Sequence, residues 1–200
     1  MYDWFLKERI CSMEFVQPIK DRKKVEAVKK VLKGSNLRDY CLFVLGTNSG
    51  LRISDLLSLN VGDVMDERGN VKDRISLKEK KTNKRKDFPI SDNAKKAIVE
   101  YLVTRNYELD EPLFMSRKKG GTLQRAQAWK VINDAAKAVG ITGHIGTHTL
   151  RKTFAYHAYK QGKDIVQIQK LLNHSSPAVT LAYIGITQEE QDEIYLTINL

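Results

Sequence analysis

The sequence is poor in the features that stabilise small secreted domains or hold a chain in a membrane. It has only two cysteines in 200 residues, Cys11 and Cys41, so a disulfide framework is excluded and a reducing compartment is favoured. No segment approaches the ~18 consecutive apolar residues typical of a membrane-spanning helix. The N-terminal residues lack the basic-then-apolar order of a secretion signal. These absences predict a cytoplasmic protein that contacts no membrane.

Side chains that bind divalent metals are scattered rather than clustered. No set of Asp, Glu and His residues has the spacing of a metal site, so we expect neither a metal nor another cofactor, and a metal-dependent nuclease is disfavoured. Positive charge, in contrast, is abundant: 34 Lys and Arg residues stand against 24 Asp and Glu residues, a net charge of +10. An excess of this size favours a polyanion such as nucleic acid as the partner, although many basic proteins bind none.

The pattern of apolar residues predicts an α+β fold, mainly α-helical with one small antiparallel β-sheet. Residues 61–90 carry short β-type runs that break at Arg68–Asn70 and Thr82–Asn83, as expected for two or three strands joined by tight turns. The apolar run Tyr40–Leu45 indicates a central, buried helix. Helical spacing predicts helices over 21–34, 37–50, 53–60, 92–106, 122–139, 147–161, 164–172, from 177 through Tyr183, and 188–195.

Capping residues support these helix boundaries. Asn36 is expected to begin a helix and Gly50 to end it, and Asn173 suits the left-handed residue at a helix C-terminus. Ser176 followed by Pro177 marks the start of another helix, because proline is favoured in a first turn.

Four segments far apart in the sequence carry side chains suited to breaking a phosphodiester bond. Two arginines fit the charge that develops on the non-bridging phosphate oxygens, because a guanidinium is always charged and binds two oxygens at once. A positioned acid can protonate the leaving 5′ oxygen, and a tyrosine can form an ester that keeps the bond energy, so no ATP is needed. The residues are Arg52 in GLRISDLLSL, Lys81 in KKTNKRKDFPI, His148 and Arg151 in HTLRKT, and His174 and Tyr183 in LLNHSSPAVTLAYIGI.

In order and spacing these segments resemble the signature of the tyrosine recombinase, or phage integrase, family over about residues 20–190. Gly50-Leu51-Arg52 matches the family's G-x-R, and His148-Thr149-Leu150-Arg151 matches its H-x-L-R. Lys81 matches the hairpin lysine, and Tyr183 follows the next histidine at the distance of the family's nucleophile. Each motif is weak alone, but together they are specific. The resemblance implies the catalytic-domain fold of that family and a metal- and ATP-independent enzyme that cuts and rejoins DNA.

By the same resemblance, the basic residues act on the scissile phosphate. Arg52 and Arg151 clamp its oxygens, and Asp55 braces Arg52. Lys81 is the general acid on the 5′ oxygen, chosen from a run of basic residues by its place before the hairpin turn. A solvated, phosphate-binding edge is the other interpretation of that run.

The histidines and the tyrosine complete the implied site. His148 assists proton transfer, His174 hydrogen-bonds the phosphate or orients Tyr183, and Tyr183 attacks to leave a 3′-phosphotyrosyl link. The chain departs from the family pattern at two places: Asn173 stands where glycine is commoner, and Lys152 where a histidine often follows the second arginine. Neither departure is expected to touch a proposed catalytic position.

Double-stranded DNA is the partner that this resemblance implies. We expect contacts to its phosphates from a basic hairpin and from the loop after the next helix. The residues expected to make them are Lys78, Lys80, Lys84, Arg85, Lys86, Arg117, Lys118 and Lys119.

Domain organisation and assembly are also expectations from the family. Residues 1–20 are expected to be an N-terminal arm or linker, and residues 21–200 the catalytic domain with a C-terminal tail over 186–200; the family's usual N-terminal core-binding domain is expected to be absent. The family acts as a tetramer on two paired sites, so we expect a homotetramer on DNA and a monomer in isolation. Residues 194–200 are expected either to join protomers or to fold back on their own domain.

A DNA-binding regulator on the same fold that no longer cuts DNA is the main alternative. All positions proposed to be catalytic are filled, which favours the enzyme. A type IB topoisomerase shares the chemistry, but its extra clamp domains do not fit in 200 residues.

Overall fold

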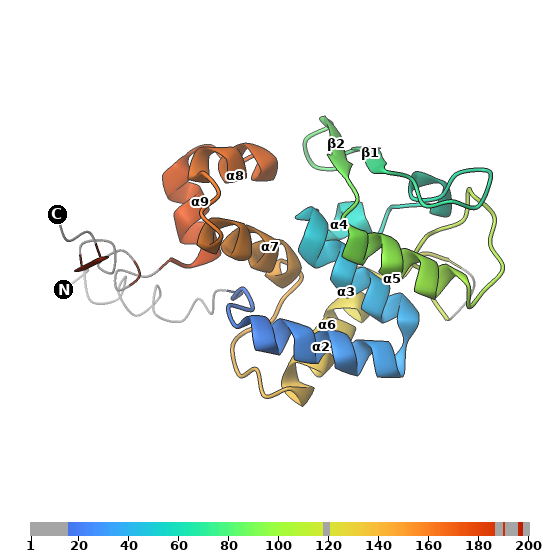
Figure 1. Cartoon of the computed structure of the whole chain (residues 1–200), viewed down its shortest axis with the longest axis horizontal. Helices are drawn as coiled ribbons and strands as arrows, with labels where there is room; N and C mark the ends of the chain where they lie inside the picture. The colour runs from blue at the N-terminus through green and yellow to red at the C-terminus, as the bar shows by residue number, and fades with distance from the viewer. Residues whose placement is uncertain (1–15, 118–120, 187–189, 191–195, 198–200) are drawn as a thin grey trace, which may run out of the picture.

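The structure is a computed structural model that describes residues 16–117, 121–186, 190 and 196–197. It consists mainly of helices beside one small sheet (Figure 1). In chain order the elements are α2 (Arg22–Ser35), α3 (Leu37–Ser49), α4 (Ile53–Leu56), the 3₁₀ helix η1 (Val61–Asp63), β1 (Arg74–Lys78), β2 (Arg85–Pro89), α5 (Asp92–Leu102), α6 (Arg125–Ala138), α7 (Thr149–Lys160), α8 (Ile165–Leu172) and α9 (Pro177–Ile184). No helix among the described residues is long and apolar enough to cross a membrane. The predicted fold class is confirmed.

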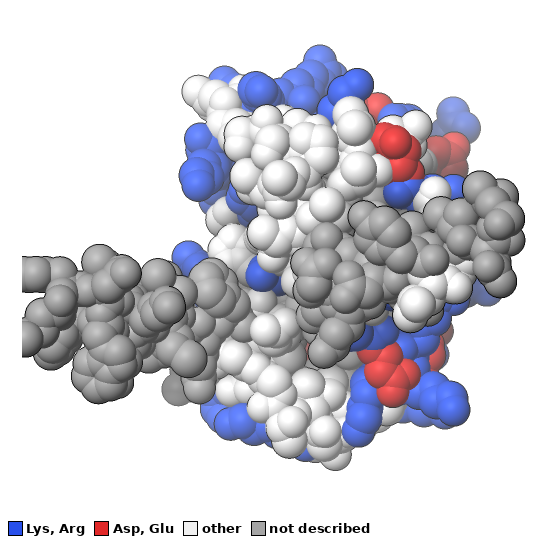
Figure 2. Space-filling view, turned by 90° about the vertical axis from the view of Figure 1, so that its left-hand side faces the viewer, with Lys and Arg blue, Asp and Glu red and all other residues white. Residues whose placement is uncertain are grey.

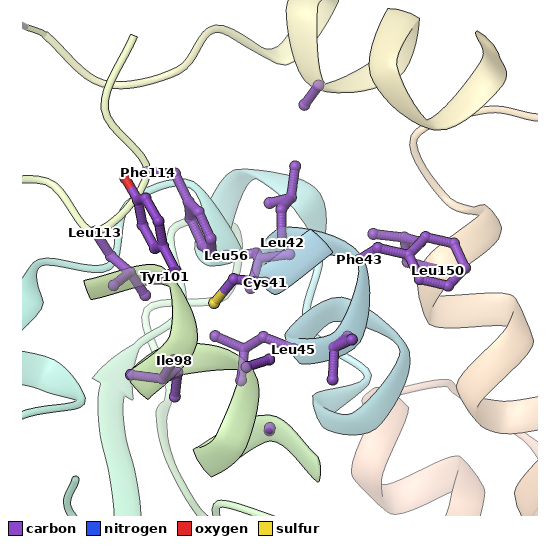
Figure 3. Close-up of a cluster of buried hydrophobic side chains, with 14 of the residues drawn as sticks. Cys41, Leu42, Phe43, Leu45, Leu56, Ile98, Tyr101, Leu113, Phe114 and Leu150 are labelled. Carbon is purple, nitrogen blue, oxygen red and sulfur yellow. The ribbon is translucent and has the colours of Figure 1, made fainter. Parts of the chain in front are cut away.

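Helix α3 forms the centre of the larger hydrophobic core. Each residue of Cys41–Leu45 is at most 1% exposed, so neighbours cover every face of the helix, as its apolar run predicts. Helices α2, α5 and α7 pack against it. Figure 3 shows Phe43 beside Leu150 of α7, and Leu45 facing Ile98 of α5. The chain that leaves α3 therefore starts from a rigid part of the molecule.

A second, smaller core joins α7, α8 and α9, which lie together in Figure 1. Its buried residues include Tyr156 of α7, Leu172 of α8 and Ile184 of α9. Leu172 lies at the end of α8, just before His174, and Ile184 follows Tyr183. This core therefore determines where His174 and Tyr183 lie.

Capping residues begin and end the helices where the sequence predicts. Asn36 begins α3 by accepting backbone N–H bonds with its side chain, and Gly50 ends it with φ 61°. A Cβ atom on Gly50 would lie 2.6 Å from the ring of Phe154, so this position requires glycine for space as well as for conformation. Asn173 ends α8 with φ 52°, and Ser176 begins α9 by accepting a backbone N–H bond.

Strands β1 and β2 form an antiparallel hairpin in which Ile75 pairs with Phe88. Because alternate residues of a strand face opposite sides, the side of β1 that buries Ile75 continues to Glu79, which is also fully buried. The backbone N–H of Glu79 donates to the carbonyl of Lys84 and extends the strand pairing. In β2 the same alternation turns Lys86 and Phe88 inward.

Both ends of the chain lie partly outside the described residues. Residues 16–20, predicted to belong to the arm, pack on the domain: Ile19 is 3% exposed, and its N–H donates to Thr153 Oγ1 at 2.9 Å. The helix predicted over 188–195 lies almost wholly outside the described residues, as does most of the tail. Glu190, which is described, forms an ion pair with Lys20 of the same chain at 2.9 Å.

Candidate active site

Arg52 lies where the chain enters α4, beside two buried carboxylates. Its Nη1 atom is 2.9 Å from Glu79 Oε1 and 3.9 Å from Asp55 Oδ2. Asp55 also accepts the backbone N–H of Lys80 at 3.0 Å. The resemblance implied support from Asp55, but Glu79 is nearer and was missed. Both contacts of Arg52 Nη1 are ion pairs without aligned hydrogen bonds, so the guanidinium keeps donors for a further acceptor.

Arg151 is the second guanidinium, and it is 2% exposed on α7. Its Nη1 donates to the carbonyl of Gly50 at 2.6 Å, and its Nη2 donates to the carbonyl of Leu172 at 2.5 Å. Burial is the main cause that lowers the pKa of Arg151, and the nearby charge of Arg52 adds to it. Because a guanidinium remains charged at any ordinary pH, the two arginines form one positive site.

Tyr183, on α9, lies against two histidines. Its hydroxyl is 3.4 Å from His148 Nδ1, and its ring is edge-on to His174 with ring centres 4.8 Å apart. Burial raises the pKa of the Tyr183 phenol, and the charges of Arg151 and Arg52 oppose that rise. The phenol is therefore protonated at neutral pH, and its attack on phosphorus requires a base.

The two histidines of the site are neutral imidazoles at neutral pH. Burial is the main cause that lowers the pKa of His148 and of His174, and nearby arginines lower both further. His174 Nδ1 lies 3.1 Å from the hydroxyl of Thr180, which is fully buried. The other ring nitrogen of His174 can then face a ligand, while His148 Nδ1 can accept the proton of Tyr183.

Lys81, predicted to be the general acid, lies exposed in the turn after β1. Its two neighbours in the turn are anchored. The N–H of Lys80 donates to Asp55, and the Thr82 hydroxyl donates to Glu79 Oε2 at 2.6 Å. The backbone at Lys81 is therefore held beside the supports of Arg52, while its side chain extends into solvent.

Lys86, predicted to contact DNA phosphates, turns towards the site. Its Nζ donates to the carbonyl of Leu171 at 3.3 Å and lies 5.7 Å from the centre of the Phe88 ring. Burial lowers the pKa of Lys86 to about 8, and the charge of Arg151 contributes to the decrease. The sequence did contain a signal for this, because the two-residue period of β2 separates Lys86 from the exposed Arg85.

The two departures from the family pattern both reach the site. The ammonium of Lys152, which is 8% exposed, lies 4.7 Å from the centre of the Tyr183 ring. The expectation that it touches no catalytic position is therefore wrong. Asn173 reaches Arg52 through Glu79, because its Nδ2 donates to Glu79 Oε2 at 3.0 Å.

The remaining residues predicted to contact DNA lie mainly on the outside of the hairpin. Figure 2 shows Lys and Arg side chains along the upper edge of the molecule, where Figure 1 places the β1–β2 hairpin and α8. Lys118 and Lys119 lie outside the described residues. The exposed members of the set are Lys78, Lys80, Lys84, Arg85 and Arg117.

Together these groups can attack a phosphodiester and stabilise the charge that develops on it. The site combines a phenol, a neutral imidazole that can take its proton, and two guanidiniums. In the part of the chain that the structure describes, no cluster of acidic, histidine and cysteine side chains could hold a metal ion. The predicted residues that converge are Arg52, His148, Arg151, His174 and Tyr183.

Comparison with known proteins matches most of the chain to one protein family. The model of the phage integrase family matches residues 20–190. The chain is 44% identical over 183 residues to the probable integrase/recombinase YoeC of Bacillus subtilis, an alignment that covers 92% of this chain and 97% of that protein. It is 34% identical over 166 residues to the tyrosine recombinase XerC of Thermodesulfovibrio yellowstonii, covering 79% of this chain and 53% of that protein. The chain thus spans about half the length of the XerC and XerD relatives.

Solved structures share the fold. The crystal structure of XerA recombinase superposes with a TM-score of 0.73 at 23% identity, over 94% of this chain and 66% of that one. XerH site-specific recombinase, bound to a palindromic difH substrate in a post-cleavage complex, gives a TM-score of 0.70 at 21% identity, over 88% of this chain and 51% of that one. At such identities the likeness shows the fold alone.

Proposed function

We propose that this chain, which belongs to the phage integrase family and is a site-specific recombinase, cuts and rejoins DNA through a covalent bond to Tyr183. The observation that carries the proposal is the 3.4 Å contact between the Tyr183 hydroxyl and Nδ1 of His148. The charges of Arg52 and Arg151 act on the same hydroxyl. A nucleophile, a base and a positive phosphate site therefore meet from separate segments of the chain.

Cleavage transfers the phosphate from the DNA 5′ oxygen to the tyrosine. As the Tyr183 oxygen attacks phosphorus, His148 Nδ1 accepts the phenol proton. The bond between phosphorus and the 5′ oxygen breaks, Lys81 gives that oxygen a proton, and a 3′-phosphotyrosyl link remains. The anchored turn supports this role for Lys81, because its backbone is held while its side chain is free to reach bound DNA.

The positive groups stabilise the transition state. Arg52 and Arg151 lie where negative charge develops on the non-bridging oxygens, and each guanidinium can bind two of them. In the tautomer whose Nδ1 accepts from the Thr180 hydroxyl, His174 adds a hydrogen bond from its other ring nitrogen. Because these donors are fixed by the fold before DNA arrives, little reorganisation is needed during the reaction.

Rejoining reverses these steps. A DNA 5′ hydroxyl attacks the phosphotyrosine, Lys81 takes its proton, and His148 returns a proton to the departing Tyr183 oxygen. The phosphotyrosine conserves the energy of the original phosphodiester, so the cycle needs no ATP.

Double-stranded DNA is the substrate, and the number of DNA strands that must be cut determines the number of protomers. The exposed basic residues of the hairpin suit contacts to phosphates. Exchange between two duplexes breaks four strands, and each protomer supplies one Tyr183. We therefore propose four protomers on paired sites and a monomer in the absence of DNA.

A nicked suicide duplex tests the function directly. Duplexes selected from random sequence by binding to the protein are nicked just 3′ of the cleavage point, so that the short fragment bearing the new 5′ hydroxyl diffuses away and the covalent complex accumulates. The wild type should form a complex that survives denaturing electrophoresis. Tyr183→Phe should bind equally but form none, and Tyr159→Phe, in the same small core, should react normally.

Two outcomes would contradict the proposal. A wild-type protein that binds the selected DNA without forming the adduct would be the non-cleaving regulator. An adduct formed by Tyr183→Phe would show that another residue is the nucleophile.

A further inference from the structure

Glu79 is a fully buried carboxylate that has no part in the reaction steps above. It follows β1 on the side of the hairpin that faces the interior, so the strand period directs it towards the active site. A buried charge is stable only when it is paired and hydrogen-bonded. The charged and hydrogen-bonding groups around Glu79 must therefore stabilise its buried carboxylate.

Three segments of the chain meet at Glu79. Its Oε1 lies 2.9 Å from Arg52 Nη1. Its Oε2 accepts hydrogen bonds from the Thr82 hydroxyl at 2.6 Å and from Asn173 Nδ2 at 3.0 Å. The carboxylate thus contacts the first arginine, the turn that carries Lys81, and the residue before His174.

Glu79 is ionised in this setting. Burial is the largest single influence and acts to raise its pKa, but the hydrogen bond from Thr82, the contact with Arg52 and the positive charges of Arg52 and Lys86 together outweigh it and lower the pKa. An anion at this place attracts Arg52 and orders the amide of Asn173.

The contact also accounts for the asparagine at position 173. The backbone there is left-handed, with φ 52°, a conformation that glycine adopts without strain and asparagine tolerates. Glycine is the commoner residue in the family pattern, but it has no side chain to reach Glu79. Asparagine supplies the same turn and a hydrogen-bond donor.

We propose that Glu79 is a positioning residue that sets the spacing between Arg52 and His174 through its two carboxylate oxygens. One oxygen holds the Arg52 guanidinium, and the other holds Asn173 and with it the start of the segment that carries His174. The proposal rests on the proposed function, since it concerns how that phosphate site is ordered. The contact that holds Arg52 is an ion pair, in which Nη1 lies 2.9 Å from Glu79 Oε1 without an aligned hydrogen bond.

A double-mutant cycle tests this role. Glu79→Gln, Asn173→Gly and the double variant are compared with the wild type in single-turnover cleavage of the nicked duplex at saturating DNA. Glu79→Gln should slow cleavage about 10- to 100-fold and Asn173→Gly about 3- to 10-fold, with DNA affinity nearly unchanged. The double variant should resemble Glu79→Gln alone, because residues that act through one contact are not additive.

Two comparisons separate positioning from general destabilisation. Asn83→Gly is a matched control, because Asn83 is also left-handed, with φ 60°, and lies exposed in the hairpin turn; it should cleave normally. In an Arg52→Ala background, Glu79→Gln should cause little further loss of rate. Thermal unfolding of each variant shows whether it is folded.

The outcomes distinguish this inference from the proposed function. If the wild type forms no Tyr183 adduct, the proposed function fails. If the wild type is active but Glu79→Gln cleaves at its rate, or the effects of Glu79→Gln and Asn173→Gly multiply, the positioning role is overturned. If Glu79→Gln does not fold, Asn173→Gly decides alone, and a normal cleavage rate in that variant overturns the role.

Discussion

At the scale of single residues, Lys152 shows how a neighbour of the nucleophile acts on it. The residue is buried, at 8% exposed, and its ammonium lies 4.7 Å from the centre of the Tyr183 ring. A cation over an aromatic ring is held by the negative charge of the ring face. That attraction increases when the phenol oxygen loses its proton to His148. Lys152 should therefore stabilise the attacking state of Tyr183 more than its resting state.

We expect Lys152→Met to lower the single-turnover cleavage rate about 5- to 30-fold, because a buried contact of this kind contributes about 1–2 kcal/mol. The rate is measured from the covalent adduct at saturating DNA. Lys160→Met is the control, because this lysine of the same helix is paired with Glu190 at 3.3 Å away from the ring. Equal rates for Lys152→Met and the wild type would mean that Lys152 contributes only packing.

Lys86 gives the site a pH dependence. Its pKa in the free protein is about 8, below the ordinary 10.5, because burial and Arg151 disfavour the charged amine. The unfolded chain keeps this proton to higher pH, so this group makes the free energy of unfolding increase as the pH rises from about 8 to 10.5. A phosphate between the two arginines adds negative charge and should raise the pKa of Lys86 in the DNA complex.

At about pH 8.5, DNA binding should therefore be accompanied by proton uptake at Lys86. Titration calorimetry in two buffers with different ionisation enthalpies measures the number of protons taken up. Lys86→Met should lose most of the uptake, and Lys84→Met, which removes an exposed amine of the same hairpin, should keep it. Identical uptake in the two variants would contradict this assignment of the pKa.

At the scale of elements, the position of each basic residue in the β1–β2 hairpin determines whether its side chain faces the site or the solvent. Strand β2 turns Lys86 inward beside Phe88 and turns Arg85 to solvent. The turn leaves Lys81 exposed between two anchored residues. The general acid in our proposal therefore comes from the turn, and Lys86 is held at the end of α8.

A substrate whose bridging 5′ oxygen is replaced by sulfur distinguishes these lysines. Lys81→Ala should cleave ordinary DNA at least about 100-fold more slowly, because the leaving oxygen lacks its acid. It should cleave the sulfur substrate at nearly the wild-type rate, since a thiolate leaves without protonation. Lys86→Ala should not be rescued; rescue of that variant instead would move the general acid from the turn to the strand.

At the scale of the whole molecule, the active site lies where the two hydrophobic cores meet. Arg52 lies between Leu51 and Ile53 of the larger core, Tyr183 packs against the smaller core, and His174 follows Leu172 of that smaller core by two residues. Polar contacts join the two sides. Arg151 donates to the carbonyl of Gly50, and Lys86 of the hairpin donates to the carbonyl of Leu171 in α8. A movement of one core against the other would separate the nucleophile from the phosphate site.

Positive charge on the outer surface should govern DNA affinity rather than the rate of cleavage. Lys84→Gln and Arg85→Gln should each reduce the slope of log affinity against log salt by about one, because each removes one phosphate contact. Cleavage at saturating DNA should stay normal. Lys29→Gln, on α2 and paired with Glu26 at 2.7 Å, is the control and should leave the slope unchanged. A slope unaffected by all three would place the DNA contacts elsewhere.

Local features of the molecule were determined by the sequence itself. The helices begin and end at Asn36, Gly50, Asn173 and Ser176 because capping depends on a few neighbouring residues. The burial of α3 follows from its continuous apolar run. The residues of the site could be named because the order and spacing of their motifs are linear properties of the chain.

Only the tertiary structure decided what those residues contact. Glu79 and Asn173 are 94 positions apart, and Arg151 bonds a carbonyl 101 positions away, so neither contact follows from local spacing. Lys152 reaches Tyr183 only because the smaller core folds α9 against α7. The residues that support the site could not be predicted from the sequence for one physical reason. Burial, charge and hydrogen bonding depend on which distant segments packing brings together.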